Sequence, residues 1–310
     1  MRLGINGTGL VLRASIQAIV EDAEAAAADG FSSYWLAEHP TGGFDALTVL
    51  TVVGQQVPGI ELGTAVVPTF PRHPMTLASQ TLTTRSAIGD RLTLGIGLSH
   101  ETMMAQLGID FAKPIRHLRE FLSILIPLLN EGKVSFDGEV LSCHAEIFRA
   151  PENPCPVVVA ALGPQALRVA GARTQGTTLA WVGPRTVREH IAPTLGAAAD
   201  AAGRPSPRII ATLPVCVTDE TERIRELVGK LLAMYAELPS YRAMFDREGV
   251  DGPGDMALVG SEDQVREKLE ELAAAGVTDF AASEFTTNDD ERARTRALLK
   301  STLTASAADS

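Results

Sequence analysis

The sequence contains little cysteine and no obvious set of metal ligands. Its 310 residues include only three cysteines, Cys143, Cys155 and Cys216, which lie far apart without paired spacing. Zinc sites need about four ligands at characteristic spacings, and the six histidines form no such motif. We therefore expect no structural metal and no disulfide framework, and we expect a reducing, cytoplasmic location.

Basic charge and long apolar runs are also scarce. Lysine and arginine number 27 against 38 aspartates and glutamates, so the net charge is −11, which argues against a nucleic-acid or anionic-membrane surface. No stretch reaches the roughly twenty apolar residues of a membrane span. The opening residues MRLGINGTGL lack the apolar core of a signal peptide. With 45% hydrophobic and 21% charged residues, the composition is that of an ordinary globular enzyme.

A dinucleotide-binding fingerprint is missing as well, because Gly7 and Gly9 are not followed by the third glycine of G-x-G-x-x-G. Instead, short apolar runs alternate with helical segments along the whole chain. The runs predict strands that begin at Arg2, Ser33, Glu61, Leu92, Val157, Thr177, Ile209 and Thr278. Eight strands, nearly all followed by helices, favour an α/β fold of the (β/α)8 TIM-barrel type over a doubly wound sheet. We predict one domain over residues 1–310.

Two segments interrupt this alternation. Residues 134–148 alternate in polarity and contain the turn pair Asp137-Gly138, which predicts a hairpin inserted within residues 131–150. Residues 238–257 are broken by proline and glycine, and they predict a lid-like excursion beside the substrate. Between the two, residues 208–217 are predicted to form one continuous strand, and residues 219–236 one helix.

The clearest βαβ pattern spans residues 60–99. A buried strand, a helix that begins after Pro71 and Pro74, and a second strand follow one another there. Both strands end in small residues, Ala65 in the first and Gly97 and Ser99 in the second. Ligands of such folds bind beyond the carboxyl ends of the strands, so these positions are candidates for a binding site.

Five motifs resemble one known family, in the right order and over nearly the whole chain. They are SSYWLAEH, ELGTAVVPTFPRHPMTLASQ, RLTLGIG, VVVAALGPQALRVAG and GSEDQVREKLEELAAAGVTDF. Together they resemble the bacterial luciferase-like flavin and deazaflavin oxidoreductases. The GTAVVPTFPRHP and AALGP forms are most similar to the branch that uses coenzyme F420, an 8-hydroxy-5-deazaflavin. The resemblance implies a (β/α)8 barrel with an insertion, and a homodimer.

The resemblance also implies a set of site residues. Glu38-His39 matches an acidic residue and a histidine beside the redox ring, which makes both catalytic candidates, with the role of Glu38 left open between orienting the histidine and facing a neighbouring helix. The bond Ala65–Val66 matches a non-proline cis peptide against that ring. Two further segments match cofactor-binding loops, and the second resembles a phosphate site at a helix start: Gly97, Leu98 and Ser99, then Ala161, Leu162, Gly163, Pro164 and Gln165. Trp181 is a candidate pocket residue or a core aromatic.

We therefore expect an oxidoreductase that transfers a hydride between coenzyme F420 and a small organic substrate. An FMN-dependent monooxygenase of the same family and a non-catalytic flavin-binding barrel remain alternatives. Sugar-phosphate dehydrogenation is disfavoured, because His100 or Glu101 aligns imperfectly with the glutamate that those relatives place after the fourth strand.

Overall fold

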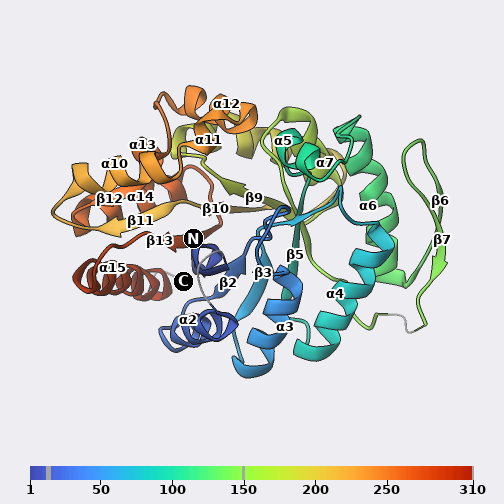
Figure 1. The fold of residues 1–310 in the computed structure, drawn as a ribbon, viewed down its shortest axis with the longest axis horizontal. Coiled ribbons are helices and arrows are strands. Elements are labelled where there is room, and N and C mark those ends of the chain that lie inside the picture. Colours follow the sequence, from blue (N-terminus) through green and yellow to red (C-terminus); the bar gives the residue numbers. More distant parts are fainter. Residues whose placement is uncertain (12–14, 149–150, 309–310) are drawn as a thin grey trace.

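The computed structural model describes residues 1–11, 15–148 and 151–308, and eight of its strands close into a parallel barrel (Figure 1). Neighbouring strands pair in parallel around the ring, and the last strand pairs with the first. In ring order the strands are β1 (Arg2–Asn6), β2 (Ser33–Leu36), β3 (Glu61–Thr64), β5 (Leu92–Gly97), β8 (Val157–Ala160), β9 (Gly176–Ala180), β10 (Arg208–Thr212) and β13 (Asp279–Glu284). The short strand β4 (Val67–Pro68) extends β3 and pairs with β5. The (β/α)8 prediction is therefore confirmed.

Helices surround this barrel and begin at recognisable signals. Asp45 accepts a hydrogen bond from the Thr48 amide at 2.7 Å, and Ser261 and Gln264 form a reciprocal capping box. The main helices are α2 (Ile16–Ala28), α3 (Ala46–Gln56), α4 (Pro74–Ile88), α6 (Pro114–Glu131), α7 (Pro164–Arg173), α9 (Ala192–Ala201), α10 (Thr221–Leu231), α14 (Glu262–Ala274) and α15 (Asp289–Ala308). None of the helices in the described ranges combines the length and apolar character that a membrane span requires.

The prediction of one strand over residues 208–217 was wrong. The run divides at Leu213, so β10 belongs to the barrel while β11 (Pro214–Val217) leaves it. Pro214 has no amide hydrogen with which to continue a strand ladder. β11 pairs instead with β13 and with β12 (Leu258–Gly260), a strand that the sequence did not reveal.

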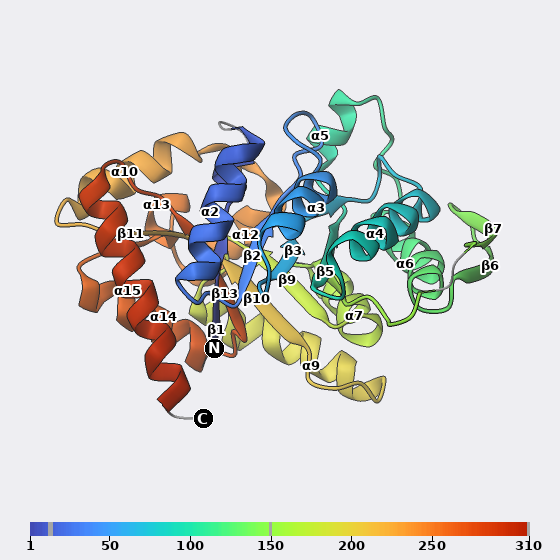
Figure 2. The ribbon, with the colours of Figure 1, turned by 90° about the horizontal axis from the view of Figure 1, so that it is seen from below.

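Residues 133–146 form an antiparallel hairpin at the outer edge of the molecule, beside α6 (Figure 2). It consists of β6 (Lys133–Asp137) and β7 (Ser142–Glu146), and Asp137 pairs with Ser142. The connection is therefore a four-residue loop and not a two-residue turn at Asp137-Gly138. The buried Glu120 explains this geometry, because its carboxylate accepts amide hydrogen bonds from residues 139, 140 and 141 at 3.0, 2.8 and 2.9 Å.

The segment 219–257 consists mainly of helices and lies at the upper left of Figure 1. The single helix expected over residues 219–236 was wrong, because α10 ends at Leu231 and a short helix, α11 (Met234–Glu237), follows. The Pro- and Gly-rich part then forms α12 (Pro239–Glu248) and α13 (Pro253–Met256). Both begin with proline at the first helical position, where the missing amide hydrogen costs nothing.

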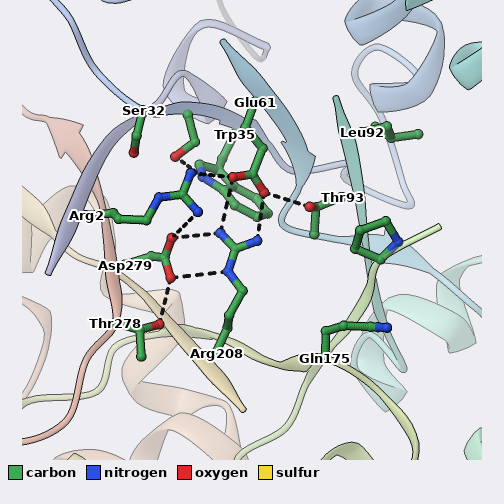
Figure 3. Close-up of polar contacts among 12 residues, drawn as sticks. Arg2, Ser32, Trp35, Glu61, Leu92, Thr93, Gln175, Arg208, Thr278 and Asp279 are labelled. Carbon is green, nitrogen blue, oxygen red and sulfur yellow. Dashed lines mark hydrogen bonds and ion pairs between the residues drawn. The ribbon is translucent and has the colours of Figure 1, made fainter. Parts of the chain in front are cut away.

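The amino ends of the strands carry a network of ion pairs, which we call the basal network: Arg2, Glu61, Thr93, Arg208 and Asp279 (Figure 3). Arg208 donates to Glu61 at 2.8 Å and to Asp279 at 2.7 Å. Arg2 contacts the same two carboxylates at 2.6 and 3.3 Å, and the Thr93 hydroxyl donates to Glu61 at 2.6 Å. These contacts join five strands of the barrel, namely β1, β3, β5, β10 and β13, at the amino ends of the strands.

Above the basal network the barrel interior is filled by apolar side chains. Trp35, Val158, Ile210 and Ala281 form a buried cluster contributed by four different strands. A Cβ atom at Gly63 would lie 2.2 Å from the Trp35 ring, so glycine is required on the neighbouring strand for the indole to fit. Apolar side chains thus fill the middle of the barrel, and open space remains at the carboxyl ends of the strands.

Candidate active site

A cavity of about 470 Å³ lies at the carboxyl ends of the barrel strands. Its floor is built from strand ends that include Asn6, Ala37, Ala65, Ala160 and Thr212. This is the end at which TIM barrels place their active sites, and the volume lies within the range of about 300–1,000 Å³ that ligand pockets occupy. The described residues contain no group of three or more His, Cys, Asp or Glu side chains arranged to hold a metal ion.

His39 lines this cavity just after β2. Two hydrogen bonds hold the backbone that leads from β2 to His39. The Thr8 hydroxyl accepts from the Ala37 amide at 2.9 Å, and the Glu38 amide donates to the Val66 carbonyl at 3.1 Å. The Thr41 hydroxyl lies 3.1 Å from Nδ1 of His39. Within the described chain Nε2 of His39 has no hydrogen-bond partner, so this nitrogen is available to a ligand.

Glu38 also lines the cavity, but its carboxylate is already engaged. Arg72 contacts Oε1 of Glu38 at 2.5 Å and Oε2 at 3.0 Å, and the Ala46 amide at the start of α3 donates to Oε2 at 3.3 Å. Arg72 also pairs with Asp45 at 2.7 Å. Of the two roles left open by the sequence, this geometry fits a residue that ties the β2 loop to a neighbouring helix.

The peptide bond between Ala65 and Val66 is cis, as the family resemblance implied. Both residues line the cavity. Gly97 lies behind them, and a Cβ atom there would come within 2.6 Å of Val66. Ser99 lines the cavity with a φ of 66°, whereas Gly97 and Leu98 do not line it.

The predicted phosphate site lies at the start of α7 and does not line the main cavity. Gly163 is the N-cap residue and Pro164 the first residue of the helix, while Ala160 at the end of the preceding strand reaches the cavity. The Leu162 carbonyl lies 2.7 Å from Nε2 of His190. A Cβ atom at Gly163 would meet no atom within 4 Å, and its φ of −77° is open to any residue. Neither packing nor backbone conformation requires glycine at this position.

An aromatic wall formed by His100, Trp181, Tyr235 and Tyr241 covers one side of the cavity. Ring centroids are 5.3 Å apart for His100 and Tyr241, 5.5 Å for the two tyrosines, and 5.2 Å for Tyr235 and Trp181. Sequence reasoning considered Trp181 but missed both tyrosines. Tyr235 lies on α11 and Tyr241 on α12. Tyr241 falls within residues 238–257, where the sequence predicts an excursion beside the substrate, but no local pattern singles out either tyrosine.

The fold and the cavity define a class, namely (β/α)8-barrel enzymes with the active site at the carboxyl ends of the strands. Residues 3–279 match the family model of the luciferase-like monooxygenases. The chain belongs to this family.

Two curated relatives cover most of the chain. A 5,10-methylenetetrahydromethanopterin reductase from Methanolobus tindarius is 24% identical over 285 residues, which is 91% of this chain and 86% of the relative. An F420-dependent glucose-6-phosphate dehydrogenase from Nakamurella multipartita is 28% identical over 254 residues, or 77% of this chain and 74% of the relative.

Solved structures share the fold at lower identity. The coenzyme F420-dependent tetrahydromethanopterin reductase from Methanopyrus kandleri superposes with a TM-score of 0.80 at 21% identity, covering 96% of this chain and 97% of that one. The oxygenating constituent of 3,6-diketocamphane monooxygenase from Pseudomonas putida, in complex with FMN, gives a TM-score of 0.75 at 18% identity and covers 97% and 96%.

Proposed function

We propose that this protein is an oxidoreductase that transfers a hydride between coenzyme F420 and a small organic substrate. The observation that carries the proposal is His39, whose Nε2 is free in the cavity just beyond β2. The names of the Methanopyrus structure and the Nakamurella relative, both F420-dependent, support the choice of cofactor.

The cavity fits a flat ring system. Its floor carries the small side chains of Ala65 and Ala160 beside Val66, which would hold a planar ring, and His39 lines the same cavity. When bound, coenzyme F420 donates or accepts the hydride. The side chain of His39 supplies a proton or stabilises the charge that develops, Glu38 and Arg72 hold the β2 loop in place, and the amide groups at the start of α7 receive the phosphate of the cofactor.

The cofactor assignment predicts that the purified protein binds coenzyme F420 more tightly than FMN. The apo protein is titrated with each compound while the fluorescence of the cofactor is followed. Tight binding of FMN without measurable affinity for F420 would favour the monooxygenase alternative, which the FMN-bound Pseudomonas structure with the same fold keeps open. Failure of both compounds to bind would exclude both reactions.

The phosphate site predicts that Gly163→Val weakens F420 binding by about tenfold or more, because a branched side chain would stand where the phosphate approaches the amide groups. The open space around Gly163 means that the variant should fold normally. Gly196→Val on α9 is the matched control, since Gly196 also has open space around it. Unchanged F420 affinity in a folded Gly163→Val protein would place the phosphate elsewhere.

A further inference from the structure

The charged side chains that line the cavity in the described chain are all acidic. Among the described residues that line it there is no lysine or arginine, whereas two carboxylates, Glu38 and Glu284, reach it. A phosphate or carboxylate group inside such a cavity would find no lysine or arginine among the described lining residues. Burial of an unpaired charge costs several kcal/mol in proteins.

Both carboxylates are neutralised from outside the cavity. Glu38 is held by Arg72, and Glu284 is held by Arg296 through contacts of 2.9 and 2.5 Å. The two arginine side chains are only 17% and 16% exposed. Arg296 also contacts Asp22 and Asp29, at 3.4 and 3.6 Å, and Arg72 contacts Asp45 as described above. These guanidinium groups are committed to buried ion pairs and cannot turn toward a ligand without breaking them.

Most of the other side chains that line the cavity are apolar or aromatic. Leu231, Leu232, Met103 and Phe285 join the aromatic wall there. Burial and the nearby His39 lower the pKa of His100, so its imidazole is neutral at physiological pH. An aromatic and aliphatic lining of this kind favours a ligand with a flat or hydrocarbon body.

The two tyrosines add polar groups to this apolar lining. Within the described chain neither the Tyr235 nor the Tyr241 hydroxyl forms a hydrogen bond, although both side chains line the cavity. Burial raises the pKa of both phenols, so they remain protonated donors at neutral pH. Both side chains are half-buried and line the cavity, so a hydrogen-bond acceptor on the substrate would pair with either hydroxyl there.

From these observations we infer the class of substrate: an uncharged molecule with an apolar or aromatic body and an oxygen acceptor that Tyr235 or Tyr241 can bind. Molecules that carry phosphate or carboxylate on that body are discriminated against. The inference rests on the proposed function for the reaction itself, but the selectivity of the cavity can be measured without turnover.

A matched pair of enones tests the selectivity. Benzylideneacetone is uncharged, and its para-carboxylate differs only by the anionic group. Binding of each is measured by calorimetry, on the apo protein and on protein saturated with oxidised F420. The neutral ketone should bind at least about tenfold more tightly in both forms. Equal affinity, preference for the carboxylate, or no binding of the neutral ketone would overturn the inference. Failure to load F420 would count against the proposed function alone.

Turnover gives a second readout when reduced F420 is the hydride donor. A hydride passes to the β-carbon of the enone and a proton to the α-carbon, so that the carbon–carbon double bond becomes single and the coenzyme is oxidised. Oxidation of F420 should be faster with benzylideneacetone than with its carboxylate. The reverse order would contradict the inference.

A positive charge introduced at Leu231 tests the same argument from the opposite direction. It lies at the end of α10, lines the cavity and is 61% exposed, so a longer side chain can be accommodated. Leu231→Arg should raise the affinity for the para-carboxylate about fivefold or more at low salt, because it supplies the missing cation. Leu231→Gln, a neutral polar control, should not. An equal gain in both variants would show that charge is not the cause.

Tyr241→Phe tests the hydroxyl group. The change keeps the ring of the aromatic wall and removes only the donor. Affinity for benzylideneacetone should fall about three- to tenfold, while affinity for the matching hydrocarbon, which lacks the carbonyl oxygen, stays the same. The same test is made on Tyr235→Phe. Unchanged ketone affinity in both variants would remove the tyrosines from the inference.

Discussion

Replacing His39 by alanine is expected to lower turnover at least about tenfold, and by as much as 10²–10⁴-fold if the imidazole transfers a proton. The physical reason is its position. His39 lies in the cavity beyond β2, Thr41 contacts Nδ1 at 3.1 Å, and Nε2 is free for the substrate or the cofactor. Coenzyme binding should change much less, because in the proposed function the floor of the cavity would supply most contacts to the ring.

Turnover of His39→Ala is measured with reduced F420 and an activated enone, and F420 affinity is measured separately by fluorescence. His144→Ala is the matched control, since His144 lies on the hairpin with its side chain 56% exposed. Full turnover of His39→Ala with the coenzyme bound would show that this histidine is only a rim residue. Equal loss of activity in the control would indicate a general effect of the substitution.

Replacing Arg208 by methionine is expected to lower the free energy of unfolding by about 3–5 kcal/mol. Methionine keeps the aliphatic bulk but leaves Glu61 and Asp279 without their shared guanidinium group. Asp279 is 2% exposed and cannot be solvated instead. Arg2 still contacts both carboxylates, but its side chain is 46% exposed and its attraction is weakened by water.

The measurement is denaturant unfolding of Arg208→Met beside Arg266→Met. Arg266 pairs with Asp263 on the surface, where the aspartate side chain is 92% exposed, so the control should change stability by no more than about 1 kcal/mol. A loss below about 1 kcal/mol for Arg208→Met would mean that the basal network contributes little to the stability of the barrel.

The difference in unfolding free energy between the native protein and Arg208→Met should depend on pH. Burial alone would raise the pKa of Glu61, but the hydrogen bonds and charge of Arg208 outweigh it and hold the pKa below its usual value. A depressed carboxyl pKa stabilises the fold above the unfolded value of about 4.3, and this contribution is lost as the pH falls through the folded value. The stability difference between the native protein and Arg208→Met should therefore shrink below about pH 4. A constant difference down to low pH would contradict the ion-pair explanation.

Most barrel strands could be located from the sequence because each is a short apolar run with polar or glycine residues at its ends. A strand buried on both faces must be apolar throughout, and the runs beginning at Glu61 and Leu92 have this composition. The error at residues 208–217 has a related origin. β10 and β11 are both buried and apolar, so the sequence pattern does not reveal that the chain changes partner at Leu213.

Part of the site could likewise be located. Residues that follow a barrel strand lie at the rim, so identifying β2 predicted a rim position for His39, and the family resemblance singled it out as a catalytic candidate. The engagement of Glu38 by Arg72 could not be assigned in this way. These residues are 34 positions apart, and they meet because α3 and α4 pack side by side on the outside of the barrel.

Periodicity and strand-end chemistry, which are local properties of the chain, thus account for the barrel, its order of strands and the rim position of His39. Contacts between distant segments account for the rest. Tyr235 and Tyr241 reach the cavity because α11 and α12 cross over its opening, and the basal network forms because ring closure brings Arg208 between Glu61 and Asp279. No pattern within a single segment encodes such contacts. Arg208 and Glu61, for example, are 147 residues apart, and their interaction exists only once the barrel has closed.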